Sequence, residues 1–269
     1  MTVWLNGRLL PAEEARIDPA DRGFTLGDGL FETIRVTGGR ARHLDRHLAR
    51  LQASAAVLEL PVPYPDDTLA GAVTALIAAR DVAEGVARLT LTRGTGARGV
   101  LPPADPHPTV LITLAPPGPP AGPVEAVIAQ ATRRNEHSPL SRLKTLNYLD
   151  AILARREAAR RGAGEALLLN TAGRLAEASI ATLFIVRDGR LLTPPVSEGA
   201  LPGIRRALIL ERHRAEERPI TPDDLWAAKE AFLSNSLGLR PLLAVDGRPI
   251  GSGLPGPVTL ALMNDPAGA

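Results

Sequence analysis

A run of proline and glycine from Pro116 to Pro123 constrains the fold of this chain more than any other feature. Proline lacks a backbone N–H and fixes its own φ, so such a run suits neither a helix nor the interior of a sheet. With 269 residues, the chain is long enough for two modest domains. We therefore predict an N-terminal domain over residues 1–118, a linker over 119–123 and a larger C-terminal domain over 124–269.

Local patterns before this run predict both strands and helices. Asn6-Gly7 suits a tight hairpin turn. Apolar residues three and four positions apart predict helices from about His43 to Leu58 and from about Asp66, whose side chain can cap its helix. The expected inner faces of these helices contain Leu44, Leu48, Leu51, Ala55, Leu58, Leu69, Val73, Leu76 and Ile77. Alternation predicts strands at residues 3–5, 8–10, 86–92 and 109–114, and another in the second half of residues 24–36.

Strands predominate after the run. They are predicted at residues 124–129, 165–169, 175–186, 190–193 and 231–234, with a hairpin turn at 246–247. Helices are predicted from Leu146 to about Gly162, and two more helices are predicted to start within residues 201–206 and 221–224. In the first of these helices the apolar spacing places Leu149, Ile152 and Leu153 on one face.

Glycines gather at two places in the N-terminal half. Gly23, Gly27 and Gly29 precede or begin a predicted strand, where they would let another backbone or a ligand approach closely. Residues 94–99 match the Gly-x-Gly-x-x-Gly pattern of dinucleotide-binding proteins, but the prolines that follow exclude the helix which that site needs. We therefore interpret this second stretch as a flexible loop whose arginines, Arg93 and Arg98, suit the binding of a carboxylate.

Composition excludes several classes of function. The net charge is only +2 and aromatic residues make up 3%, which argues against nucleic-acid binding. No apolar run approaches the ~20 residues that span a bilayer, and the N-terminus does not resemble a signal peptide. The absence of cysteine is consistent with a cytoplasmic protein. His43 and His47 lie four apart on a helix, but with no third ligand nearby we expect no metal site.

Lys144 is the strongest candidate for a catalytic residue. Of the 31 lysines and arginines only Lys144 and Lys229 are lysines. Because the chain uses arginine for almost every other cation, a lysine at position 144 indicates a task that arginine cannot perform. An ammonium can lose its proton and condense with an aldehyde to a Schiff base, whereas a guanidinium cannot. Lys144 lies in a short apolar run just before a predicted helix, where burial would favour the neutral amine, whereas Lys229 has the sequence context of a surface residue.

Two further features of the C-terminal half suit the same cofactor as Lys144. Pyridoxal phosphate needs an amine for its aldehyde, an anion site for its phosphate and an acid for its ring nitrogen. The helix start at Gly203-Ile204-Arg205 offers the anion site, with Ser234 or Ser236 as a hydroxyl donor. Glu177 stands in an uncharged segment, where a carboxylate is costly unless it meets a cation or a donor; an edge-strand position facing water is the alternative.

These residues resemble the class IV, or fold-type IV, pyridoxal-phosphate enzymes. The resemblance covers nearly the whole chain. It rests on the following segments: Asp21-Arg22-Gly23, Gly27-Asp28-Gly29-Leu30-Phe31-Glu32, His47-x-x-Arg50-Leu51, Lys144-x-x-Asn147-Tyr148, Glu177 and Leu201-Pro202-Gly203-Ile204-Arg205. It implies an α+β fold, with a small N-terminal α/β sandwich domain and a larger β-rich C-terminal domain, and a homodimer.

The resemblance also implies roles for individual residues. Lys144 would carry pyridoxal 5'-phosphate as a Schiff base and shuttle the proton, and Glu177 would pair with the ring nitrogen. Leu201 would pack on the ring and Tyr148 would lie near its phenolic oxygen. The phosphate would be bound by Arg50, Gly203, Ile204, Arg205 and Ser236. The substrate would contact Phe31, Arg98 and Asn235.

The family contains several activities. The loop at 93–99 and Asn235-Ser236-Leu237 are similar to 4-amino-4-deoxychorismate lyases, which release pyruvate and 4-aminobenzoate for folate biosynthesis, and this is the function the sequence favours. Val100 stands where those lyases usually have Tyr. A D-amino-acid or broad-specificity transaminase is the alternative, although Val100 and Phe31 depart from the His and Tyr of D-amino-acid transaminases. The branched-chain aminotransferases rank third, because they have one more residue between the lysine and Asn-Tyr and a Gly-Thr-Ala turn where this chain has Asn235-Ser236-Leu237. A catalytically silent binding protein on the same scaffold is the alternative from a different class.

Overall fold

A computed structural model of the chain describes residues 1–119 and 122–265, and the chain divides into two units. The first unit contains Met1–Gly118 together with Leu143–Asn147, and the second contains Pro119–Arg142 and the chain from Tyr148 onward. Pro120 and Ala121 of the predicted linker lie outside the described residues. The sequence assigned Leu143–Asn147 to the C-terminal domain, but in the structure they belong to the first unit because they pair with one of its strands.

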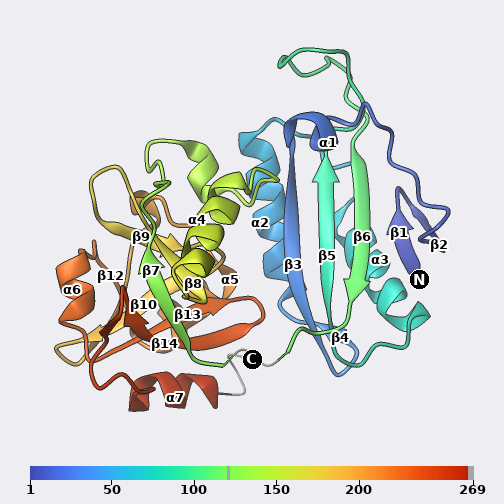
Figure 1. Ribbon diagram of the computed structural model, residues 1–269. Coiled ribbons are helices and arrows are strands. Elements are labelled where there is room, and N and C mark those ends of the chain that lie inside the picture. The colour runs from blue at the N-terminus through green and yellow to red at the C-terminus, as the bar shows by residue number, and fades with distance from the viewer. Residues whose placement is uncertain (120–121, 266–269) are drawn as a thin grey trace. The chain divides into compact units, whose positions relative to one another are not determined.

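The first unit is an antiparallel sheet of six strands in the order β2-β1-β6-β5-β3-β4, and Figure 1 shows α2 and α3 on one of its faces. Its strands are β1 (Thr2–Leu5), β2 (Arg8–Pro11), β3 (Gly29–Thr37), β4 (Arg40–Ala41), β5 (Gly85–Thr92) and β6 (Thr109–Ala115). Its helices are α1 (Arg22–Leu26), α2 (Leu44–Val57) and α3 (Asp66–Ala79). The predicted strands and the two long helices are therefore confirmed.

The core of the first unit lies between the sheet and α2 and α3. The residues predicted for the inner faces of the two helices all pack into it. The predicted cap of α3 is wrong: Asp66 is the first helical residue, Pro65 precedes it as N-cap, and the Asp66 carboxylate accepts a hydrogen bond from the Gln52 amide at 2.8 Å. Asp66 thus lies where its negative charge favours the helix dipole rather than where it could cap a backbone N–H.

The second unit is a mixed sheet of nine strands, in the order β12-β11-β10-β13-β14-β7-β8-β9 with β15 beside β14. The pairs β7–β8, β7–β14 and β11–β12 are parallel and the others antiparallel. Its strands are β7 (Val124–Ile128), β8 (Glu165–Leu169), β9 (Leu175–Ala178), β10 (Thr182–Arg187), β11 (Arg190–Thr193), β12 (Glu216–Glu217), β13 (Glu230–Asn235), β14 (Gly238–Val245) and β15 (Arg248–Pro249). Its α-helices are α4 (Leu149–Arg160), α5 (Ile204–Arg212), α6 (Pro222–Trp226) and α7 (Pro257–Met263), and short 3₁₀ helices cover Pro139–Arg142 and Val196–Glu198. No helix among the described residues is long and apolar enough to cross a membrane.

Two predictions for the second unit are wrong. The single strand predicted at 175–186 is broken into β9 and β10, because the Ala178 N–H bonds to the Ala181 carbonyl in a tight bend. Helix α4 begins at Leu149 rather than at the predicted Leu146, and the apolar residues that the spacing placed on one face are exposed: Leu149, Ile152 and Leu153 are 74%, 50% and 45% accessible.

The opposite face of α4 is buried by contacts that the leucine spacing does not reveal. Ala154 and Ala158 pack against β7 and β8, and their small side chains let the helix lie close to the sheet. The Glu157 carboxylate accepts hydrogen bonds from the backbone N–H groups of Gln130 and Ala131 at 3.0–3.1 Å. Those bonds hold this face inward because the two amides would otherwise lack a partner.

The segment carrying Lys144 is attached to β3 by backbone pairing. The Phe31 N–H donates to the Lys144 carbonyl at 2.9 Å, and the Leu146 N–H donates to the Gly29 carbonyl at 3.0 Å. Glycines make this approach possible: a Cβ on Gly29 would lie 2.5 Å from the Leu91 carbonyl oxygen and 2.8 Å from the Leu146 side chain. The prediction that glycines beside this strand admit another backbone is thereby confirmed.

Replacing Gly29 by alanine should weaken this attachment. We expect Gly29→Ala to lower the free energy of unfolding by about 2 kcal/mol or more, because the new methyl group collides with backbone that cannot move freely. Gly71→Ala is the matched control: Gly71 lies within α3, and its added Cβ would meet nothing within 4 Å. The control should raise stability by up to about 1 kcal/mol. Urea unfolding followed by circular dichroism measures both, and equal stabilities for the two variants would contradict the steric argument.

Candidate functional site

In the first unit, two cations lie over one aromatic ring. The Nζ of Lys144 is 4.3 Å from the centroid of the Phe31 ring, and the Cζ of Arg88, on β5, is 3.7 Å from the same centroid. Phe31 is buried and Lys144 half-buried. A ring face attracts each cation by roughly 0.5–2 kcal/mol, depending on its desolvation. Phe31 therefore holds the candidate catalytic amine and a guanidinium near one another.

Arg88 did not emerge from the sequence. Along β5 the alternation buries Ala87 and Leu89 in the core and turns Arg88 to the other face of the sheet. Its neighbour there depends on the register between β3 and β5, in which Phe31 lies opposite Thr90 and Thr33 opposite Arg88. The sequence does show that Arg88 is a single cation on the outer face of a strand. It does not show the register between β3 and β5, which brings Arg88 next to Phe31.

A buried carboxylate orients Arg50, the residue predicted to bind the cofactor phosphate. Glu32 is 1% exposed and accepts two hydrogen bonds from Arg50, from Nε at 2.8 Å and from Nη2 at 2.6 Å. The Nδ1 of His47 lies 2.6 Å from the same carboxylate. Burial alone would raise the pKa of Glu32, but the hydrogen bonds from His47 and Arg50 and their charges outweigh it and lower that pKa.

In the second unit, Glu177 lies among donors. Its Oε1 is 3.0 Å from the Nε of Arg134 and its Oε2 accepts a hydrogen bond from the Leu201 N–H at 2.9 Å. Glu177 is 9% exposed, so the alternative of a strand residue facing water does not describe it. Arg134 also donates to the carbonyls of Gly199 and Ser141, which fixes its guanidinium. The sequence did not identify Arg134 as a site residue, because nothing distinguishes it from the other arginines of the chain.

The N-terminus of α5 faces two strand hydroxyls. Gly203 is the N-cap of this helix, and a Cβ there would lie 3.2 Å from the Thr182 hydroxyl oxygen. Thr182 pairs with Ser234 across β10 and β13. Ser234 is 2% exposed, and its hydroxyl has no hydrogen-bond partner among the described residues. A buried hydroxyl and the first amides of a helix form the kind of donor set that binds a phosphate.

The remaining predicted site residues lie at four places in the chain. Ile204 and Arg205 begin α5 and are buried, Leu201 is half-buried ahead of them, and half-buried Tyr148 is the N-cap of α4. Ser236 is half-buried in the turn after β13. Asn235 stabilises that turn, since its amide oxygen accepts from the Leu237 N–H at 2.9 Å. Arg98 is exposed on the loop between β5 and β6. The roles assigned to all of these residues stay predictions.

Comparison with known proteins decides the family. Residues 29–245 match the family model described as Amino-transferase class IV, which is most of the chain. The chain belongs to the class IV aminotransferase family. Enzymes of this family depend on pyridoxal phosphate, so the predicted family, enzyme class and cofactor are confirmed.

Relatives named as aminotransferases match this class IV enzyme over almost its whole length. A putative branched-chain-amino-acid aminotransferase of Methanocaldococcus jannaschii is 31% identical over 270 residues, covering 97% of this chain and 94% of its own. A D-alanine aminotransferase of Listeria innocua is 32% identical over 288 residues, covering 98% and 94%. These names argue against the catalytically silent binding protein.

Solved structures confirm the α+β fold of the family. The branched-chain aminotransferase of Escherichia coli has a TM-score of 0.93 at 29% identity, covering 97% of this chain and 91% of its own. A branched-chain aminotransferase of Thermoproteus uzoniensis, solved with norvaline, has a TM-score of 0.91 at 31% identity, covering 98% and 92%. A putative 4-amino-4-deoxychorismate lyase of Legionella pneumophila has 0.85 at 30% identity, covering 93% and 94%.

The residues of this class IV enzyme fit its cofactor. The amine of Lys144 can take the aldehyde, and Glu177 is a buried acid of the kind a protonated ring nitrogen needs. The unpartnered Ser234 hydroxyl and the narrow space beside Gly203 suit a phosphate at the start of α5. Each unit thus carries groups that pyridoxal phosphate requires.

The lowered pKa of Glu32 predicts a pH-dependent stability. A carboxylate with a depressed pKa in the folded state stabilises that state above its unfolded pKa, and the contribution disappears as the pH falls through the folded pKa. Near pH 7, Glu32→Gln should lower the free energy of unfolding by about 3 kcal/mol, and the difference from wild type should shrink as the pH falls below about 4.5.

Urea unfolding at several pH values measures this difference. Glu14→Gln, which changes an exposed carboxylate of the same unit, is the control and should track wild type at every pH. A gap between wild type and Glu32→Gln of the same size at pH 7 and pH 3.5 would show that the Glu32 charge does not provide the stabilisation.

Proposed function

We propose that this protein is an amino-acid aminotransferase, which moves the amine of an α-amino acid to a 2-oxo acid. The observation that carries the proposal is the position of Arg88 beside Lys144. The sequence favoured the lyase through the loop at 93–99 and Asn235-Ser236-Leu237, and a loop that keeps Arg98 without a neighbouring His suits a lyase, which has less need of a dedicated carboxylate clamp. Arg88 supplies a guanidinium on the rigid sheet that can serve as one.

The distances suit an α-amino acid. Because both cations lie within 4.3 Å of one ring centroid, the Nζ of Lys144 and the Cζ of Arg88 are no more than about 8 Å apart. An α-amino acid carries its carboxylate one carbon from its amine, and a bidentate guanidinium adds about 3 Å between donor and acceptor atoms. A substrate held with its nitrogen at the position of the lysine nitrogen and its carboxylate at Arg88 would span a distance of this order.

Each candidate residue has a definite task in this reaction. Arg88 would orient the substrate by its carboxylate, and the amine of Lys144 would take the proton from the carbon that bears the nitrogen. The cofactor, when bound, supplies the electron sink for that step. Glu177, fixed by Arg134 and the Leu201 N–H, would hold a proton on the ring nitrogen. Arg50, fixed by Glu32, would bind phosphate.

The lyase is the second candidate. The similarity to the Legionella protein and the sequence of the loop at 93–99 favour it. The two reactions share their first proton removal and then diverge: a transaminase leaves the cofactor in its amine form and needs a 2-oxo acid to restore it. A lyase instead expels pyruvate as the substrate ring becomes aromatic, and needs no acceptor.

A single-turnover experiment decides between the two activities. With purified enzyme and pyridoxal phosphate, either D-alanine or L-leucine alone should convert the bound cofactor to its pyridoxamine form, followed by absorbance, and a 2-oxo acid should restore it. Aminodeoxychorismate should release no 4-aminobenzoate. Lys144→Ala is the negative control. Aromatic product released without any 2-oxo acid, with both amino acids inert, would replace the aminotransferase by the lyase.

The role of Arg88 is tested separately. Arg88→Gln should raise KM for the amino acid by about tenfold to a hundredfold, which corresponds to the ~1.5–3 kcal/mol of a hydrogen bond to a charged group. A primary amine without a carboxylate should react equally with both enzymes. Arg8→Gln, which changes an exposed arginine on strand β2, should leave KM unchanged. An unchanged KM in Arg88→Gln would remove the observation on which the proposal rests.

A further inference from the structure

The loop between β5 and β6, residues 93–108, has no core of its own. Figure 1 shows it extending beyond the ends of both strands. Val100 and Leu101 at its crest are 84% and 85% exposed, and Arg98 beside them is exposed too. Burial of apolar side chains therefore cannot fix the crest, and its conformation depends on hydrogen bonds.

The base of the loop is fixed against the start of α1. The carboxylate of Asp21 accepts hydrogen bonds from the hydroxyls of Thr92 and Thr109 at 2.8 Å, which joins the two strands that flank the loop. The Arg22 N–H donates to the Gly94 carbonyl at 2.8 Å. Gly94 has φ +79°, and a Cβ there would lie 1.8 Å from the His107 carbonyl oxygen, so the two sides of the base touch.

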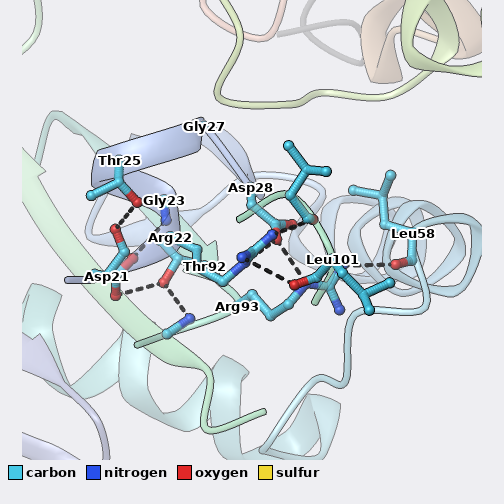
Figure 2. Close-up of polar contacts among 12 residues, drawn as sticks. Asp21, Arg22, Gly23, Thr25, Gly27, Asp28, Leu58, Thr92, Arg93 and Leu101 are labelled. Atoms are coloured by element: carbon cyan, nitrogen blue, oxygen red, sulfur yellow. Dashed lines mark hydrogen bonds and ion pairs between the residues drawn. The ribbon is translucent and has the colours of Figure 1, made fainter. Parts of the chain in front are cut away.

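The crest is fixed by one side chain, that of Arg22. Its Nη1 donates to the Gly99 carbonyl at 3.0 Å and to the Leu101 carbonyl at 3.4 Å, and its Nη2 donates to the Val100 carbonyl at 2.8 Å. Its Nε bonds to the Asp28 carboxylate at 2.9 Å. Figure 2 shows the guanidinium between Asp28 and the loop. Arg22 is 3% exposed, so these bonds form away from water.

Only a guanidinium can make this set of contacts. Its donors point outward in one plane, so a single group can bind three consecutive carbonyls on one side and a carboxylate on another. The chain turns at Gly99, with φ +121°, to bring those carbonyls together. The stem of Arg22 passes close to Gly96, where a Cβ would lie 3.0 Å from the Arg22 Cδ. The loop is thus wrapped around Arg22.

We propose that Arg22 is a positioning residue for substrate recognition: by holding residues 99–101, it fixes the direction in which the adjacent Arg98 meets an anionic group of the substrate. This inference rests on the proposed aminotransferase activity. In the described chain Arg98 has no hydrogen bond or ion pair, so its guanidinium is available to a ligand. If residues 99–101 were not held, the side chain of Arg98 would point in many directions. Each binding of substrate would then include the entropic cost of ordering the loop.

Arg93 was predicted to bind a carboxylate together with Arg98, but it is buried against Asp28 and therefore provides a matched control for Arg22. It is 4% exposed and bonds to the same Asp28 carboxylate oxygen at 2.8 Å. Its other donors bind the carbonyls of Leu58 and Glu59 at the end of α2, at 2.8 and 2.9 Å, instead of the loop crest. Figure 2 shows both arginines beside Asp28. Substitution of either arginine should therefore lower the stability of the protein. Only substitution of Arg22 should also release residues 99–101 of the loop.

Trypsin measures the position of the loop without any activity. Cleavage between Arg98 and Gly99, identified by mass spectrometry in native protein with its cofactor bound, should be about tenfold faster or more in Arg22→Gln than in wild type, since at least one charge-assisted hydrogen bond is lost. Arg22→Lys should not restore protection, because an ammonium cannot reach three carbonyls at once. Arg93→Gln should cleave at this bond like wild type. Equal cleavage in Arg22→Gln and wild type would overturn the proposal.

Kinetics then connect the loop to recognition. Arg22→Gln should raise KM for an amino acid about tenfold and leave kcat within about twofold, and Arg98→Gln should do the same. The KM of the double variant should not exceed that of Arg98→Gln alone, since both substitutions remove the same contact between Arg98 and the substrate. Arg93→Gln should leave KM unchanged. Faster cleavage of Arg22→Gln without any change in KM would also overturn the proposal.

Binding of an unreactive carboxylate separates this proposal from the proposed activity. 4-Methylvalerate, titrated against cofactor absorbance, should bind about tenfold more weakly to Arg22→Gln than to wild type or Arg93→Gln, even if no amino acid is turned over. If amino acids do not react but 4-methylvalerate still binds more weakly to Arg22→Gln, the proposed aminotransferase activity is wrong and the positioning role of Arg22 is supported. Equal binding to all three proteins would defeat the positioning role itself.

Discussion

The pairing of residues 143–147 with the start of β3 is the contact on which the chemistry of the first unit depends. Two backbone hydrogen bonds attach a segment that is distant in sequence to the sheet, and Gly29 provides the space for it. Lys144 thereby becomes part of the same rigid element as Phe31 and Arg88. A nucleophile on an isolated loop would sample many positions, whereas an amine held by a strand ladder keeps its distance from neighbouring groups.

Local patterns predicted much of the fold. The turn at Asn6-Gly7 and the helix at 44–57 follow from backbone preference and apolar spacing, which act over a few residues. The same reasoning failed for α4, where the buried face is made by small alanines and a carboxylate that binds backbone amides. The larger apolar side chains of that helix remain exposed, so the stripe that the apolar spacing marks is not the buried face of the helix.

The candidate site divides in the same way. Lys144 and Glu177 could be selected from the sequence because each is chemically unusual where it stands. Arg88 and Arg134 could not, since the chain contains many arginines and what distinguishes these two is a ring or a carboxylate contributed by another strand. Arg22 shows the same limit: its motif was visible, but the carbonyls it binds lie more than seventy residues away.

The shared carboxylate of Asp28 has a consequence for how the enzyme responds to pH. Burial alone would raise the pKa of Asp28, but the hydrogen bonds and charges of Arg93 and Arg22 outweigh it and lower that pKa. Guanidinium groups do not titrate in proteins. The charges that fasten the loop crest and the end of α2 are therefore constant throughout the neutral and alkaline range. A variation of rate with pH in that range therefore does not originate in this fastening of the loop, which has no proton to gain or lose.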